Sequence, residues 1–238
     1  MQILQPESIL HRKIFYRGVI FLHPMYILSM GETKRFPNKL FAIIVFEKDE
    51  KKFYSLSISE EEIQRDKEIW DIGSLVLVEG IEKVYDKRNP IYKPVGRIEL
   101  QRKLSKQELK EFLFTKRIRY NDFIKDDGIK YGIIKVVDFE DIIFQEDPNT
   151  DELRANISVL LEGMNRHQRV NVKDYRWVQY WNRMRDFNIH EKRRKEFTDL
   201  FKRYSSDIYL IMYKYYNYKQ DRSFDYVSGF HWLYTSKL

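Results

Sequence analysis

Residues 169–185, RVNVKDYRWVQYWNRMR, change their hydrophobic period half way along. Up to Lys173 the segment alternates like a strand, with Val170 and Val172 on the same side. From Asp174 onward the large apolar residues share one helical face, and they are Trp177, Val178, Trp181 and Met184. Asp174 is a suitable N-cap for that helix. The stretch therefore predicts a strand, a cap and a helix in succession.

An earlier stretch, residues 52–70, repeats this pattern. FYSLSI alternates, Ser59 and Glu62 form a capping box, and a short helix is expected as far as Trp70. A short apolar run precedes each unit, at 41–47 and 157–162, and two more strand-like segments follow each unit. Each half thus has the order β-β-β-α-β-β, which is that of a five-stranded OB-type barrel.

The predicted fold class is therefore α+β, mostly β, with two tandem OB-like barrels. We expect an N-terminal barrel at 1–103, a helical linker at 104–120 and a C-terminal barrel at 121–238. The first strand of the N-terminal barrel is expected at 14–22, and the C-terminal barrel carries a basic helical insert at 186–203. The linker contains a second capping box, Ser105 with Glu108, so we expect a short helix and two barrels packed together. Trp70 and Trp177 are expected to plug their barrels, each from a helix.

Composition excludes several classes of protein. The 238 residues include no cysteine, which rules out disulfides, thiolate metal sites and a cysteine nucleophile. Aromatic residues make up 16% of the chain, and this argues for a folded protein. No apolar run is long enough to span a bilayer and no export signal is visible, so we expect a cytoplasmic protein without a membrane partner.

The net charge of +7 is concentrated in one segment. Residues 163–204 hold twelve Lys and Arg against five Asp and Glu, so the rest of the chain is neutral. Residues 138–152, just before that segment, hold seven acidic residues and no basic ones. A localised basic face is typical of nucleic-acid binding, although it is also compatible with a solvated helix face.

Candidate binding residues lie in the loops that usually close over a ligand in an OB barrel, namely the loop between strands one and two and the loop between strands four and five. In the first half these are residues 28–40, with Lys34 and Arg35, and residues 85–94, with Lys87, Arg88 and Tyr92. Bases can stack on rings while cations follow the phosphates. The alternative for Tyr92 is simple packing beneath its loop.

The corresponding loop of the second half, residues 213–225, mixes tyrosines with cations, and its candidate residues are Tyr216, Tyr218, Lys219 and Arg222. Alternation places Tyr216 and Tyr218 on one face and predicts that Tyr215 lies in the core. The helical insert adds Arg193, Arg194 and Lys195 as candidate phosphate contacts. A basic amphipathic helix of this kind also suits a partner groove or an anionic membrane surface, but no second membrane signal is visible in the sequence.

The sequence contains no convincing catalytic arrangement. The five histidines are scattered and no pair has the i, i+4 spacing of a zinc site, and no glycine-rich phosphate loop occurs. No cofactor is expected. The best enzymatic candidate is the acidic run Asp138, Glu140 and Asp141, which could bind Mg²⁺ for phosphodiester cleavage. Strand alternation would bring only two of these three carboxylates to one side.

The segment Asp174–Trp177 is of D-x-R-W type, and it is followed by an apolar strand, a polar loop and the closing strand YVSGFHWLY. This ending resembles the dual OB-fold modules of prokaryotes, which are often encoded near mobile elements and defence systems. The resemblance covers the last third of the chain, and the cysteine-containing N-terminal motif of that group is absent. It implies a binding module and carries over no catalytic residue.

These observations predict a non-catalytic protein that binds single-stranded or structured DNA or RNA. The resemblance implies that it is a subunit of a prokaryotic defence or mobile-element system. Two alternatives stay open. One is an adaptor subunit that docks to a protein partner through the acidic hairpin at 138–152 and the basic helix. The other is a metal-dependent nuclease built on the acidic run.

Overall fold

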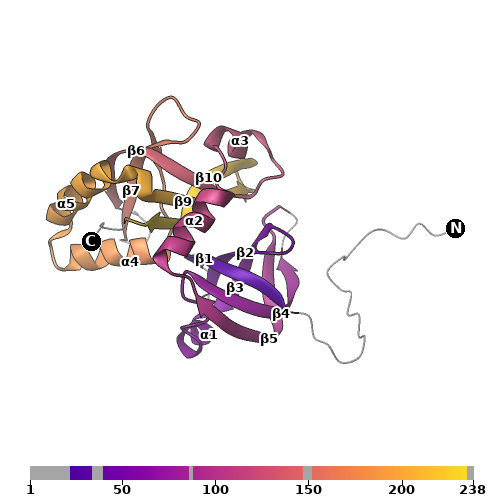
Figure 1. Cartoon of the computed structure of the whole chain (residues 1–238). Helices are drawn as coiled ribbons and strands as arrows, with labels where there is room; N and C mark the ends of the chain where they lie inside the picture. The colour runs from indigo at the N-terminus through magenta and orange to yellow at the C-terminus, as the bar shows by residue number, and fades with distance from the viewer. Residues whose placement is uncertain (1–21, 34–39, 86–87, 147–151, 235–238) are drawn as a thin grey trace, which may run out of the picture.

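The first half forms a closed five-stranded barrel in the computed structural model, which describes residues 22–33, 40–85, 88–146 and 152–234 (Figure 1). The strand order around the barrel is β1-β2-β3-β5-β4. The elements are β1 (His23–Thr33), β2 (Leu40–Glu47), β3 (Lys52–Ser59), α1 (Glu60–Arg65), β4 (Ser74–Tyr85) and β5 (Ile91–Lys103). A parallel pair, Leu56 with Tyr92, closes the barrel between β3 and β5. This strand order is that of an OB barrel and confirms the prediction for this half.

Alternating side chains fill the barrel, including Ile43, Val45, Leu56 and Ile58, all with no exposed area. The capping box of Ser59 and Glu62 is present at the start of α1. Trp70 is buried against this core, as expected for a plug. Its position on a helix was predicted wrongly, because α1 ends at Arg65 and Trp70 lies in the turns that follow.

The first strand also differs from the prediction. Nearly all of the expected strand at 14–22 lies outside the described residues. The first described strand, β1, runs to Thr33 and therefore occupies the beginning of the expected loop at 28–40. Leu28 and Ser29 are fully buried and Met30 packs against the barrel core, so burial extends the strand through the beginning of a segment that the sequence pattern had assigned to a loop.

The second half repeats the strand order but does not close. Its sheet has the order β10-β9-β6-β7-β8 and is open, which corrects the prediction of a second barrel. The elements are β6 (Tyr131–Glu146), β7 (Leu153–Leu161), β8 (Gln168–Val170), α4 (Tyr175–Asp186), α5 (His190–Arg203), the short 3-10 helix η1 (Ser205–Asp207), β9 (Ile208–Asn217) and β10 (Arg222–Trp232). Beyond β8, an isolated parallel bridge between Val172 and Val227 touches the other edge. Because β8 has only three residues, this contact does not extend into a ladder.

The predicted strand, cap and helix at 169–185 are confirmed. Val170 and Val172 are buried, and the Asp174 carboxylate accepts hydrogen bonds from the backbone N–H groups of Arg176 and Trp177 at the start of α4. Trp177 and Trp181 point into the core of the second half, where Phe201 of α5 joins them. Trp177 also donates from Nε1 to the Ala155 carbonyl at 2.6 Å, which fixes α4 over β7.

The two halves are packed together, as the linker predicted. The linker contains α2 (Lys106–Lys116), which begins with the expected capping box of Ser105 and Glu108, and it leads into α3 (Tyr120–Lys125). A shared apolar cluster joins residues of the first barrel, α2 and the second sheet, and its buried members are Leu28, Ile44, Phe46, Leu109, Leu113, Tyr131, Ile133, Tyr209, Ile211 and Leu233. His231 of β10 is buried within this interface and donates from Nε2 to the Leu28 carbonyl at 2.7 Å.

Candidate nucleic-acid interface

The hairpin of β9 and β10 carries exposed rings at its tip. Asn217 ends β9 and its side-chain oxygen accepts from the Lys219 backbone N–H at 2.9 Å, which organises the turn. Tyr216 and Tyr218 lie on either side of Asn217, with ring centroids 5.1 Å apart and planes at 77°. The Tyr218 side chain is 53% exposed. The hairpin therefore presents an edge-to-face ring pair to solvent.

Arg88, from the loop between β4 and β5, reaches this ring pair across the two halves of the chain. Its guanidinium carbon lies 4.1 Å from the Tyr216 ring centroid and 5.9 Å from that of Tyr218. Asp221 accepts a hydrogen bond from the Tyr216 hydroxyl and lies 3.8 Å from Arg88. The hydrogen bond to this carboxylate raises the pKa of Tyr216 above its ordinary value. Three sequence-predicted residues, Arg88, Tyr216 and Tyr218, thus meet in one cluster.

Asn89 fastens the loop to the hairpin. Its side-chain nitrogen donates to the Tyr216 carbonyl at 3.0 Å, and its side-chain oxygen accepts from the Tyr216 backbone N–H at 2.8 Å. The Asn89 side chain is buried although it lies in a loop. Sequence reasoning missed this residue. The Asn-Pro dipeptide at 89–90 indicates a turn, but nothing near it in the sequence indicates its partner 127 positions away.

The prediction for Tyr215 was wrong. Tyr215 is 40% exposed, whereas its neighbour Lys214 is buried. The Lys214 ammonium donates to the carbonyls of Ile124 and Asp126 at the end of α3, at 3.0 and 2.8 Å. Backbone carbonyls at a helix C-terminus stabilise a cation there. Lys214 therefore supports the hairpin and is not available to a phosphate.

The other loop candidates have different positions. Lys34, Arg35 and Lys87 lie outside the described residues. Tyr92 packs edge-to-face on Tyr54 at 5.0 Å beside the barrel core, so packing explains this ring. Lys219 is exposed on the turn of the hairpin, and Arg222 at the start of β10 lies over the Phe224 ring at 4.5 Å. The loop cations that remain near the ring pair are thus Arg88, Lys219 and Arg222.

The basic helix α5 lies apart from the ring pair. β6 starts at Tyr131, which pairs with Tyr213 near the hairpin, and Asp141 contacts α5 ten residues further along the strand. At about 3.3 Å per residue, these two contacts are up to about 33 Å apart along β6. Figure 1 shows α5 and α3 on opposite sides of the second half. Arg193, Arg194 and Lys195 therefore form a separate surface.

Two of the three predicted cations of α5 form ion pairs with acidic residues of the same helix. Arg193 contacts Glu196 at 2.7 Å, and Arg194 contacts Glu191 at 3.1 Å. Lys195 is exposed. Exposed ion pairs of this kind contribute little stability, so a phosphate could replace the carboxylate partners at low cost.

The acidic run does not form a metal site. Asp138 contacts His167 at 2.9 Å, Glu140 accepts from the Ser158 hydroxyl, and Asp141 accepts from the Thr198 hydroxyl at 3.2 Å. The three carboxylates thus have separate partners. Within the described ranges, no group of three His, Asp or Glu side chains is placed to hold a metal ion.

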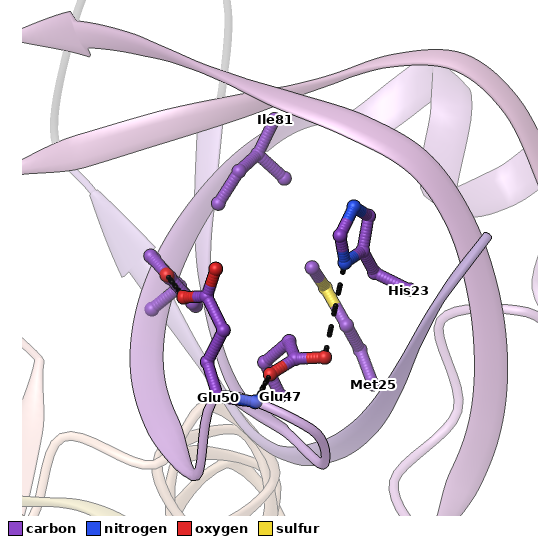
Figure 2. Close-up of a pocket in the computed structure, with 6 residues that line it drawn as sticks. His23, Met25, Glu47, Glu50 and Ile81 are labelled. Atoms are coloured by element: carbon purple, nitrogen blue, oxygen red, sulfur yellow. Dashed lines mark hydrogen bonds and ion pairs between the residues drawn. The ribbon is translucent and has the colours of Figure 1, made fainter. Parts of the chain in front are cut away.

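One end of the first barrel contains a small pocket (Figure 2), and its lining includes His23, Glu47 and Glu50. Glu47 is 1% exposed, and its Oε1 accepts no hydrogen bond. The cavity has a volume of about 10 Å³, which is enough for about one water molecule. A nucleotide base cannot enter, so this pocket is not part of a nucleic-acid interface.

No protein-family model and no curated protein matches the chain. Among solved structures, the chain is similar to a replication protein A heterotrimer bound to single-stranded DNA, with 9% identity, a TM-score of 0.38, and coverage of 81% of this chain and 43% of that chain. A murine DNA-binding protein bound to double-stranded DNA has 10% identity, a TM-score of 0.35, and coverage of 88% and 96%. The tetrameric p202 HIN2 has 10% identity, a TM-score of 0.29, and coverage of 65% and 70%.

The chain thus spans less than half the length of the replication protein A chain that it matches. The assignment of the first half to the OB class rests on its strand order and not on these scores. Among the described helices, none is long and apolar enough to cross a membrane.

Proposed function

We propose that this protein binds nucleic acid without catalysing a reaction. The observation that carries the proposal is the cluster of Arg88, Tyr216 and Tyr218, in which a cation and two rings lie together on an exposed turn. Rings offer stacking surfaces to unpaired bases, and nearby cations neutralise the phosphate backbone. Lys219 and Arg222 extend the positive charge along the same hairpin.

The acidic run gives no support to a nuclease. A two-metal or one-metal phosphodiesterase needs carboxylates that converge on a common ion. Here the carboxylates of Asp138, Glu140 and Asp141 turn to different partners. Binding without cleavage is therefore the function that the described residues support best.

A fluorescence-anisotropy titration tests the proposal. The ligands are unrelated single-stranded DNA, single-stranded RNA and duplex DNA oligonucleotides, each at two salt concentrations. We expect binding that weakens as salt rises, because phosphate contacts release counterions. Tyr218→Ala should weaken single-strand binding by about 1–3 kcal/mol, whereas Tyr218→Phe should retain it. Absence of binding to every ligand at low salt would refute the proposal.

The basic helix provides a second, protein-docking candidate. Phe187, at the corner between α4 and α5, is 61% exposed, and the Arg183 guanidinium lies 5.8 Å from its ring centroid. An exposed ring beside cations can insert into an acidic, apolar groove on a partner protein. If Phe187→Ala abolished association with a copurifying protein and left oligonucleotide binding unchanged, this surface would be assigned to docking.

The biological setting belongs to the same proposal. The resemblance to dual OB-fold modules supports a cytoplasmic role in a prokaryotic defence or mobile-element system. In such a setting an unpaired strand of DNA or RNA would be the ligand. Comparison of DNA and RNA affinities in the titration distinguishes these two ligands.

A further inference from the structure

The first barrel cannot use the face through which an OB barrel usually binds. That face is formed by strands two and three, here β2 and β3. The outward side chains Ile44 and Phe46 of β2 are buried, and both belong to the cluster shared with the second sheet and α2. On β3, Phe53 lies 6.1 Å from the Tyr131 ring of β6. The second half of the chain therefore covers this face.

With β2 and β3 covered, Arg88 of the β4–β5 loop is the described part of this binding region that remains exposed. Of the two loops that usually contribute, the β4–β5 loop carries Arg88 and Asn89, and it is fastened to the β9–β10 hairpin. The hairpin is the equivalent loop of the second half, because β9 and β10 are its fourth and fifth strands. The same loop of each half thus meets at one point on the surface.

The Asn89 side chain makes this junction by forming the hydrogen bonds that a neighbouring strand would otherwise make with β9. β6 pairs with β9 from Tyr131, and the Lys214 backbone N–H still donates to the Lys130 carbonyl at 2.9 Å. Two residues further along β9, at Tyr216, the N–H and carbonyl on that side would lack a partner, because β6 does not extend so far. The Asn89 carboxamide supplies both hydrogen bonds. Asn89 therefore fixes Arg88 beside the Tyr216 ring.

We infer that a single nucleic-acid strand binds across this composite site, with a base on Tyr218 and a phosphate at Arg88, and that Asn89 is the positioning residue that holds the two loops in register. The inference rests on the proposed function. The ligand is a single strand because a duplex keeps its bases stacked on each other and hides the faces that Tyr218 would contact. Asn89 itself is buried, so its role is to position the neighbouring residues and not to contact the strand.

The test compares Asn89→Ala, Arg88→Ala and Tyr218→Ala in the full chain, by anisotropy with a fluorescent oligothymidylate over a range of salt concentrations. We expect Asn89→Ala to weaken binding at least about fivefold, within the range measured for the loss of one stacked base. We also expect it to flatten the salt slope by about 0.7, as Arg88→Ala does, because one phosphate contact is lost. An uncharged residue with a merely structural role would leave that slope unchanged.

A matched substitution elsewhere and two further variants serve as controls. Asn165→Ala removes an exposed asparagine on the loop between β7 and β8 and should bind like the parent. Asn89→Asp keeps an acceptor for the Tyr216 N–H but replaces the donor with a buried negative charge that faces the Tyr216 carbonyl, so its affinity should fall at least as far as that of Asn89→Ala if the junction is the cause. The double variant Asn89→Ala with Tyr218→Ala should lose less binding free energy than the sum of the two single variants, because both substitutions act on one site.

The outcomes distinguish this inference from the proposed function. If the parent binds but Asn89→Ala retains the parental affinity and slope, Asn89 is not a positioning residue. If Tyr218→Ala and Arg88→Ala also bind like the parent, or if duplex DNA binds as tightly as the single strand, the composite site is wrong and nucleic-acid binding lies elsewhere. If the parent binds no oligonucleotide, the proposed function fails first.

Discussion

Replacing Asp174 should show how the strand-cap-helix segment is tied to the rest of the second half. The Asp174 carboxylate is 1% exposed and has two distinct roles. Its Oδ1 accepts from the backbone N–H of Arg176 at 2.9 Å, at the start of α4. Its Oδ2 accepts from the backbone N–H of Phe230 in β10 at 2.8 Å. One side chain thus connects the helix to the last strand.

The magnitude follows from these contacts. Loss of an N-cap costs about 1 kcal/mol, and a Phe230 N–H left without its charged acceptor costs about 2 kcal/mol. We therefore expect Asp174→Ala to lower the free energy of unfolding by about 3 kcal/mol. In Asp174→Asn the amide oxygen can still cap α4, but the amide nitrogen then faces the Phe230 N–H, so the loss should be intermediate.

Urea denaturation followed by tryptophan fluorescence measures both losses, because Trp177 and Trp181 lie in the core beside this helix. The Asp174→Asn variant separates the cap from the connection to β10. If Asp174→Ala changed the free energy of unfolding by less than 0.5 kcal/mol, a threshold of about the size of an ordinary surface substitution, the assigned role would be refuted.

Three further predictions concern the interface between the halves and the basic helix. Burial lowers the pKa of His231 to about 4, so the unfolded chain binds a proton at a higher pH than the folded chain does. The free energy of unfolding should therefore fall by up to about 3 kcal/mol as pH decreases from 6.5 to 4. Urea titrations at several pH values should show that His231→Gln lacks this pH-dependent loss of stability. Gly229→Ala should lower the free energy of unfolding by about 2 kcal/mol in the same assay, because the added Cβ would lie 2.6 Å from the Ser29 Cβ. An unchanged stability would mean that the contact between β10 and Ser29 relaxes without cost. Reversal of Arg193, Arg194 and Lys195 to Glu should weaken binding to all oligonucleotides and flatten the single-strand salt slope by up to about 2, whereas an unchanged slope would assign α5 to protein docking.

Local signals in the sequence predicted the elements well. The capping boxes at Ser59 and Ser105 and the cap at Asp174 depend on residues within three positions, and all three are present. The strand order of the first barrel also followed from the pattern. Closure of the second sheet did not, because it depends on pairing between β8 and β10, more than 50 residues apart, where only the Val172–Val227 bridge forms.

The error at Tyr215 has a specific cause. Both faces of β9 are buried, one against the core of its own half through Leu210 and Met212, and the other against the first barrel through Tyr209 and Ile211. The strand therefore has no apolar-to-polar alternation from which to assign its inner face. Tyr215 continues the face directed at the first barrel, but it lies beyond the end of that contact and is exposed.

The sequence predicted the residues of the candidate site but not their arrangement, because the arrangement also depends on contacts between the two halves. Rings and cations at 216–222 and at Arg88 are recognisable by composition, but their meeting depends on how the second half covers the first barrel. That packing buries Ile44 and Phe46 on the usual binding face and brings the Asn89 loop to the open side of β9. Interfaces of this kind depend on long-range contacts, and no short-range pattern encodes them. The second half thus covers the usual binding face of the first barrel and places the equivalent loops of both halves side by side, where we propose the binding site.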